Sequence, residues 1–363
     1  MIDNEKDLAE YLAGLGDTFS GMDLEADSLH RYEDRLCLIQ YTDGEQHRLI
    51  DPLACDDMEV FQARIQKTKI WMHGADYDMT LMRKAWGIVP ELIYDTQIAA
   101  RLVGAKRFGY ANLVEDFLGV ELDKGSQKAD WSIRPLTEKM TEYALNDVVY
   151  LQPLSEILLK RLEETGRYDW FIESCLEAQK RATERSHEKE DPWRIKGSGK
   201  LTPEGLAYLR EIWLWREEEA KEWDRPVFMV CSNKTLIDWV FSLLKGEIPK
   251  LPKHYRSKRI NRFVAATNKV KKLKKEEYPQ KPKVVRAKRD PEYEEKVDRI
   301  ISAKNTVAEE LDIDSSLLSS RATIEAIVRG DLEAEACMMS WQYALLKDIV
   351  AKEVGAKSSE EGE

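Results

Sequence analysis

The sequence lacks the features of a membrane or secreted protein. No apolar run approaches the roughly 18 residues that a membrane-spanning helix needs. The first residues, MIDNEKDLAEYL, do not show the basic-then-apolar order of a secretion signal. We therefore expect a cytoplasmic protein without a membrane segment.

Cysteine is scarce and scattered. The five cysteines lie far apart, and no Cys-x-x-Cys pair occurs among them. An odd number of widely spaced cysteines argues against a disulfide framework and against a structural zinc site. We expect reduced, mostly buried thiols.

The composition is that of a folded protein. With 363 residues, 43% of them hydrophobic and 34% charged, the chain is long enough for about two to three domains with separate cores.

Positive charge is concentrated in one segment. Residues 250–289 contain 16 lysines and arginines and two acids, which gives +14 within a chain of net charge −11, so the remainder carries −25. A basic segment of this kind can bind a phosphate backbone by releasing counterions. A solvated linker has the same composition, so both interpretations stay open.

The first half of the chain alternates strand-like and helix-like segments. Strands are predicted at 36–42, 47–53 and 69–74, and helices at 78–86, 95–104 and 112–119. A further helix is predicted from Thr137, a suitable cap, to Leu151, with Tyr143 and Asp147 on one face. This order predicts an α/β domain with a mixed sheet over residues 1–180.

The second half is predicted to be helical. In its first helix, Thr202 is a potential cap and Pro203 takes the first helical position. The predicted division is a connector at 181–201, a helical domain at 202–272, a basic linker at 273–290, a second helical domain at 291–354 and a disordered tail at 355–363.

Four acids and a tyrosine occur in settings that suit a metal site. Asp23 and Glu25 are two residues apart in a predicted strand, so both side chains point to one face. Tyr143 and Asp147 are four residues apart on a predicted helix and are therefore neighbours, and Asp78 adds a further carboxylate. Carboxylate oxygens suit Mg²⁺ or Mn²⁺, and a pair of such ions can catalyse phosphodiester hydrolysis. This pattern predicts a nuclease.

Three longer segments, in order, resemble the exonuclease motifs of the RNase D family of 3′→5′ exoribonucleases, which includes an exosome-associated nuclear branch. They are MDLEADSLHRYEDRLCLIQY, HGADYDMTLMRKAWGIVPELIYDTQIAARLVG and KADWSIRPLTEKMTEYALNDVVYLQPL. After them, 209–240 is similar to the HRDC domain that such proteins carry, and 311–330 is a weaker match to a second one. The resemblance implies an RNase H-like exonuclease domain followed by two small all-α HRDC-like domains.

The resemblance also assigns roles to single residues. Asp23, Glu25, Asp78 and Asp147 match the family's metal-binding carboxylates, and Tyr143 matches the tyrosine that positions the attacking water. Two divalent cations, Mg²⁺ or Mn²⁺, are the implied cofactors.

The second motif contains two candidate acids. The family's acid falls five residues after His73, which selects Asp78, and Asp76 is expected to be exposed. In the first motif, Leu24 stands where many members have threonine. Its side chain should point to the opposite face of the strand, so the assignment of the two acids is unaffected.

Other residues of the motifs are expected to support the site. His73 should end a strand, and Asp95 should cap a helix or support the metal site. Trp131 and Arg134 either line the product channel or brace the third motif, and we favour bracing. Four tryptophans of the first helical domain are expected mostly in its core, namely Trp213, Trp215, Trp223 and Trp239. Candidate phosphate contacts are Arg256, Lys258, Arg259 and Arg262.

The resulting hypothesis is a metal-dependent 3′→5′ exoribonuclease that releases nucleoside 5′-monophosphates. Its expected partners are RNAs with single-stranded 3′ ends, tRNA precursors among them, and no obligatory protein partner is evident. A 3′→5′ DNA exonuclease would use the same carboxylates and stays open. A non-catalytic RNA-binding protein is disfavoured because all five site positions are intact, and a two-metal phosphatase would not need the helical domains.

Overall fold

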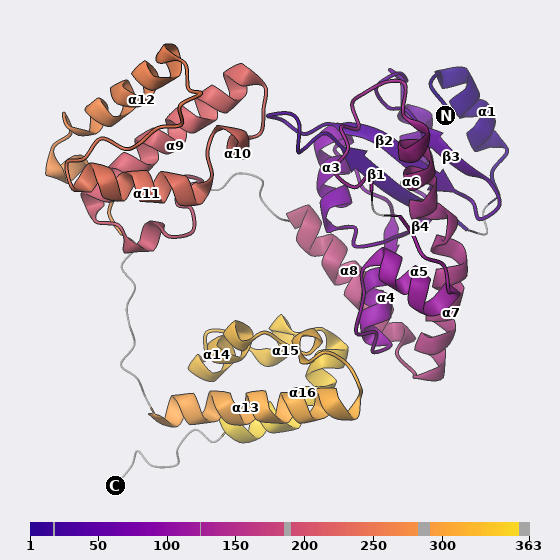
Figure 1. Ribbon diagram of the computed structural model, residues 1–363. Helices are drawn as coiled ribbons and strands as arrows, with labels where there is room; N and C mark the ends of the chain where they lie inside the picture. The colour runs from indigo at the N-terminus through magenta and orange to yellow at the C-terminus, as the bar shows by residue number, and fades with distance from the viewer. Residues whose placement is uncertain (17–18, 124, 185–189, 282–290, 356–363) are drawn as a thin grey trace, which may run out of the picture. The chain divides into compact units, whose positions relative to one another are not determined.

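A five-stranded mixed sheet with the strand order β3-β2-β1-β4-β5 forms the centre of the N-terminal part of the chain (Figure 1). The strands are β1 (Gly21–Ala26), β2 (Leu36–Thr42), β3 (His47–Ile50), β4 (Lys69–Met72) and β5 (Leu92–Asp95). The pairs β1–β4 and β4–β5 are parallel, whereas β2–β3 is antiparallel. The predicted α/β domain with a mixed sheet is confirmed.

Strand β5 is a strand that the sequence analysis did not predict. It has only four residues, LIYD, and leads directly into a helix at Thr96. Such a short run shows no period of its own, and β5 becomes recognisable only through its pairing with β4.

The computed structural model describes residues 1–16, 19–123, 125–184, 190–281 and 291–355. They form two compact units, one with residues 1–25, 36–184 and 291–355 and one with residues 26–35 and 190–281. Parts of the predicted connector and basic linker, and nearly all of the predicted tail, lie outside the described residues. None of the described helices combines the length and apolar character required to cross a bilayer.

Helices cover both faces of the sheet. In the first unit they are α1 (Glu5–Ala13), α2 (Glu59–Ile65), α3 (Asp76–Trp86), α4 (Thr96–Leu102), α5 (Tyr110–Leu118), α6 (Glu138–Val149), α7 (Leu151–Glu164) and α8 (Tyr168–Glu184). Helix α6 packs on β2 and β3, while Phe61 of α2 meets Tyr41 of β2 at 5.6 Å between ring centroids. All seven residues of β2 are therefore buried, which explains its nearly continuous apolar run.

The second unit is a small helical core. Its helices are α9 (Pro203–Trp223), α10 (Val227–Val230), α11 (Asn233–Leu244) and α12 (Ser257–Val270). Thr202 caps α9 by accepting a hydrogen bond from the Gly205 N–H at 3.1 Å, as the sequence predicts. Trp215 and Trp239 are buried against Phe263, but Trp223 is 47% exposed and so is not the core residue we expected.

The C-terminal helices belong to the first unit together with the sheet. They are α13 (Pro291–Glu310), α14 (Arg321–Arg329), α15 (Ala334–Cys337) and α16 (Ser340–Val354). Trp341 of α16 stacks on Trp170 of α8 with ring centroids 4.8 Å apart, and the Glu173 carboxylate accepts the Ser340 N–H at 2.6 Å. Their apolar side chains thus continue the core that lies behind the sheet.

Candidate active site

Strand β1 presents two carboxylates to one side of the sheet. Met22 and Leu24 are buried on one face, and Asp23 and Glu25 alternate with them on the other. Leu24 therefore points away from the acids, as expected. Helix α6 covers the acidic face and begins at Thr137, whose hydroxyl accepts the Met140 N–H at 3.2 Å.

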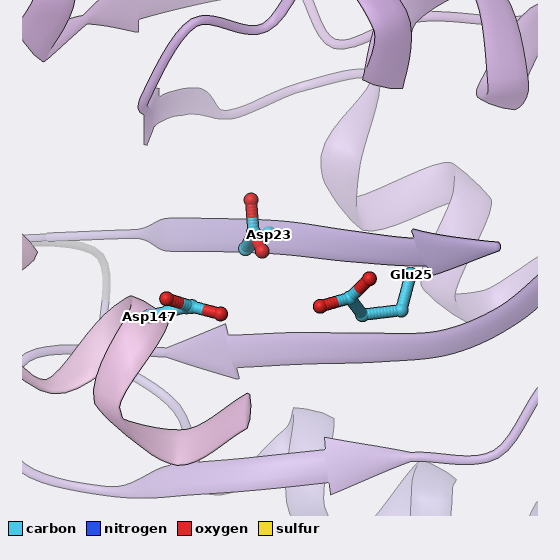
Figure 2. Close-up of side chains that lie close together, drawn as sticks. All are labelled: Asp23, Glu25 and Asp147. Atoms are coloured by element: carbon cyan, nitrogen blue, oxygen red, sulfur yellow. The ribbon is translucent and has the colours of Figure 1, made fainter. Parts of the chain in front are cut away.

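Three of the predicted acids meet between β1 and α6. One carboxylate oxygen from each of Asp23, Glu25 and Asp147 lies within 4.8 Å of the other two. Figure 2 shows Glu25 extending from β1 and Asp147 extending from α6 toward each other, next to Asp23. All three side chains are half-buried. Hard oxygen donors at this spacing are a suitable ligand set for Mg²⁺ or Mn²⁺.

Asp78 is the fourth predicted acid and lies in the first turn of α3. It is not part of the three-residue group, but it is buried, with 7% of its surface exposed, and the charge of Asp23 acts on it. Asp76, its competitor, is exposed. Asp78 is therefore the acid of this motif that faces the protein interior near Asp23.

Without cations the carboxylates hold their protons strongly. Burial first, and then the charges of Asp23, Asp147 and Asp78, raise the pKa of Glu25 to about 10. Burial and the charge of Asp23 raise the pKa of Asp147 and that of Asp78 as well. Divalent cations would remove this conflict by compensating the negative charges. The donor set and its electrostatics thus fit a divalent metal centre.

Tyr143 lies one helical turn before Asp147 on α6. Burial first, and then the charges of Asp147, Glu25 and Asp23, raise the pKa of its hydroxyl above the ordinary tyrosine value. The hydroxyl therefore stays protonated at neutral pH and can act as a hydrogen-bond donor. Its ring packs against that of Trp131, with the two ring centroids 6.0 Å apart.

Trp131 and Arg134 brace the segment before α6. Trp131 is 1% exposed in the core beneath that helix. The Arg134 guanidinium donates to the Asp51 carboxylate at 2.7 Å and to the Cys37 carbonyl at 2.7 Å. These bonds tie the segment to β2 and to the end of β3, which supports bracing over lining a channel.

His73 and Asp95 hold the ends of strands β4 and β5. His73 Nδ1 lies 2.9 Å from the Thr96 hydroxyl, which itself donates to the Met72 carbonyl, so His73 bonds locally as expected. The Asp95 carboxylate accepts the Gln97 N–H at 2.7 Å, capping α4. It also accepts the N–H groups of Gly74 and Ala75 at 2.9 and 3.0 Å, immediately before α3, so it supports the helix that carries Asp78.

Tyr110 is a neighbour of the site that the motifs did not reveal. Its hydroxyl donates to the Asn146 carbonyl at 3.3 Å, and its ring lies 5.4 Å from that of His73. Burial, and then the charges of Asp147 and Asp23, raise its pKa. Its position at the start of α5 carries no spacing signal relative to the acids, so only the packing of α5 against α7 brings it here.

The predicted phosphate contacts lie on the second unit. Together with Trp223 and His254 they line a pocket of about 470 Å³ beside the end of α9. Lys258 pairs with Glu222 at 2.7 Å and Arg259 with Glu219 at 2.8 Å, and Arg262 pairs with both acids. Among the described residues, Arg256 is the one member of this set without a carboxylate partner. Four cations against two acids leave the pocket positive.

Comparisons with known proteins match two parts of the chain and its overall fold. A family model described as a 3′-5′ exonuclease matches residues 1–163, and the HRDC domain model matches residues 205–240. The crystal structure of Escherichia coli RNase D aligns over 99% of both chains with a TM-score of 0.72 and 26% identity. This likeness, together with the mixed sheet, confirms the RNase H-like exonuclease fold.

Curated relatives named ribonuclease D span much of the chain. The protein from Cronobacter turicensis is 36% identical over a stretch that covers 59% of each chain. The protein from Sphingobium indicum is 27% identical over 94% of this chain and 91% of its own. The protein from Escherichia coli K12 is 32% identical over 85% of this chain and 83% of its own. This chain belongs to the ribonuclease D family of 3′→5′ exoribonucleases.

Proposed function

We propose that this exoribonuclease uses two divalent cations, Mg²⁺ or Mn²⁺, held by Asp23, Glu25, Asp78 and Asp147. The observation that carries the proposal is the convergence of three carboxylates within 4.8 Å, with a fourth buried acid close enough to Asp23 for their charges to interact. When bound, the ions would supply Lewis acidity to the attacking and leaving oxygens of a phosphodiester.

The protein side chains fix the geometry of the metal ligands and orient the attacking water. Asp23 and Glu25 lie on a rigid strand and Asp147 on a capped helix, so the ligand geometry is set before substrate arrives. Tyr143 keeps its proton and donates a hydrogen bond that orients the attacking water toward the terminal phosphate. Hydrolysis at the 3′ end releases a nucleoside 5′-monophosphate.

We infer that structured RNA with a single-stranded 3′ end, such as a tRNA precursor, is the substrate. The E. coli RNase D structure is described as that of an exoribonuclease involved in structured RNA processing. The positive pocket of the second unit supports an RNA contact there, with Arg256 as the first candidate because no carboxylate of the described residues pairs with it. Lys258, Arg259 and Arg262 would share phosphate contacts with their acidic partners.

The domain division that we propose follows the predicted boundaries. A nuclease domain at 1–180 cleaves, and helical domains at 202–272 and 291–354 contact the RNA. The helices at 291–354 belong to the same compact unit as the sheet, so this second helical domain would act while packed on the nuclease domain. The HRDC match at 205–240 supports the first of these helical domains.

A time course with 5′-labelled single-stranded RNA tests the proposal. Wild type with Mg²⁺ or Mn²⁺ should produce a ladder that shortens from the 3′ end, and EDTA should abolish it. Asp78→Asn should lower the rate by more than about 100-fold. Mutation of a residue that only hydrogen-bonds to a metal ligand already lowers activity by about 10–100-fold, and loss of a ligand should cost more. Asp76→Asn is the matched control two residues away and should retain the wild-type rate. Equal losses in both variants, or a metal-independent ladder, would refute the ligand assignment, and faster cleavage of a matched DNA strand would refute the RNA preference.

A further inference from the structure

Gln40, in the middle of β2, is a buried amide without a partner. It is 0% exposed, and within the described part of the chain neither its Oε1 nor its Nε2 forms a hydrogen bond. A buried donor or acceptor without a partner loses its hydration and gains no hydrogen bond in return. Native proteins seldom leave both ends of one buried amide unpaired, so the residues that surround Gln40 bear on its role.

The side chain of Gln40 points to the acidic face of the sheet. A Cβ built on Gly21 of β1 would lie 2.9 Å from the Thr42 Cγ2 of β2, so positions 21 and 42 share a face. The opposite face contains Ser20 and Tyr41, whose hydroxyls are 2.9 Å apart. Because side chains alternate along a strand, Gln40 shares the face of Gly21 and Thr42.

The same register places Gln40 beside Asp23. Strands β1 and β2 are neighbours in the sheet. They run antiparallel, because Gly21 lies beside Thr42 at one end of the pair and the Asp27 N–H donates to the Arg35 carbonyl at 3.4 Å at the other. Counting two residues forward from Gly21 and two back from Thr42 makes Asp23 and Gln40 cross-strand neighbours. The first candidate metal ligand therefore has a glutamine amide at its side.

Apolar residues lie next to Gln40 on β3 and on α6. On β3 it is paired with Leu49. Helix α6 covers this part of the sheet with an apolar cluster that contains Leu38, Leu49, Met140 and Ala144. Gln40 thus has an apolar neighbour on β3, whereas its neighbour on β1 is the acid Asp23.

We propose that Gln40 is a positioning residue for the metal centre: its Nε2–H donates to the Asp23 carboxylate and fixes that ligand once divalent cations are bound. The inference rests on the proposed two-cation site and adds a residue to it. A glutamine suits this task because it supplies a hydrogen-bond donor without adding another charge to the acids. A hydrogen bond to the Asp23 carboxylate would recover the cost of leaving the amide unpaired, so Gln40 would favour the loaded form.

The test compares Gln40→Met, which keeps the length of the side chain and removes the amide, with Gln179→Met. Gln179 is a matched control because its amide is fully used: Oε1 accepts the Ile93 N–H at 3.1 Å and Nε2 donates to the Pro90 carbonyl at 2.8 Å. Binding of Mn²⁺ is followed by the EPR signal of the free ion. Thermal unfolding in EDTA reports on the metal-free protein.

Gln40→Met should leave the melting temperature in EDTA unchanged or raised and should weaken Mn²⁺ binding by about 10–100-fold. Its turnover number should recover at saturating Mn²⁺, which a fold defect would not allow. Gln179→Met should lower the melting temperature and leave Mn²⁺ binding unchanged. Wild-type Mn²⁺ affinity in Gln40→Met overturns the inference. So does failure of both Gln40→Met and Gln40→Leu to fold, because the amide would then be needed without metal. Absence of Mn²⁺ binding by the wild type would instead overturn the proposed metal centre itself.

Discussion

Replacing Asp147 by asparagine should stabilise the metal-free protein and abolish its response to metal. The oxygens of Asp23, Glu25 and Asp147 lie within 4.8 Å of one another. At that distance two full charges repel by about 3.5 kcal/mol in a medium of effective dielectric constant near 20. Because retained protons relieve part of this repulsion, we expect a gain of about 2 kcal/mol in the free energy of unfolding, which corresponds to about 4–8 °C in melting temperature.

The gain should depend on pH in a defined direction. The pKa of Glu25 is raised to about 10 in the folded protein from an ordinary value of 4.5. Between these values the folded state binds more protons than the unfolded state, so the wild type loses stability as the pH rises. At pH 5 the acids are protonated and Asp147→Asn should match the wild type. The difference should grow toward pH 9, because removing one acid lowers the pKa values of the others.

Differential scanning calorimetry in EDTA from pH 5 to pH 9, repeated with Mn²⁺, measures both effects. Mn²⁺ should raise the melting temperature of the wild type and leave that of Asp147→Asn unchanged. Glu142→Gln is the control, since Glu142 is an exposed acid on the same helix and should change neither curve. A metal-free Asp147→Asn protein that is less stable than the wild type at pH 8.5 would refute the electrostatic reasoning.

Three further perturbations follow from the structure. Tyr143→Phe should lower the turnover number by about 10–100-fold, because that factor corresponds to the free energy of a hydrogen bond to a charged group. The Mn²⁺ affinity measured by EPR should stay unchanged. An unchanged turnover number would show that Tyr143 takes no part in the chemistry. Trp341→Ala should lower the free energy of unfolding, measured with denaturant, by about 3–5 kcal/mol, because it removes the stacked contact with Trp170. Trp223→Ala, at a residue 47% exposed, should lower it much less, and equal losses would contradict the packing. Arg134→Met should lower the free energy of unfolding by about 3–5 kcal/mol, because it leaves the buried Asp51 carboxylate unpaired. Arg107→Met, at an exposed ion pair, should leave the same free energy nearly unchanged.

Much of the site was predictable because its geometry is local. Two acids two residues apart in a strand must share a face, and a tyrosine and an acid four apart on a helix must be neighbours. The caps at Thr137 and Thr202 are equally local, since each side chain bonds an N–H three residues ahead. The choice of Asp78 over Asp76 came from a family spacing, and the burial of Asp78 agrees with it.

The remaining features depend on contacts between distant segments. Strand β5 is too short for a pattern of its own and exists through its pairing with β4. Trp223 has the same helical setting as its buried neighbours, but it lies at the end of α9, where the Arg259 guanidinium covers its ring at 5.1 Å in place of a core. Three of the four predicted phosphate contacts turned out to be paired with Glu219 and Glu222, which are about 40 residues away in sequence.

The faces of β1 and α6 that bear acids, several of the elements around them and the family could be predicted from the sequence. These features depend on periods of two and of about 3.6 residues and on short motifs. The approach of three carboxylates from β1 and α6 to within 4.8 Å, the place of Tyr110 against α6 and the burial of Gln40 with no hydrogen bond to a described residue became visible in the tertiary structure alone. Burial and pairing across a sheet are properties of segments brought together by the hydrophobic core, and no local pattern encodes which segments will meet.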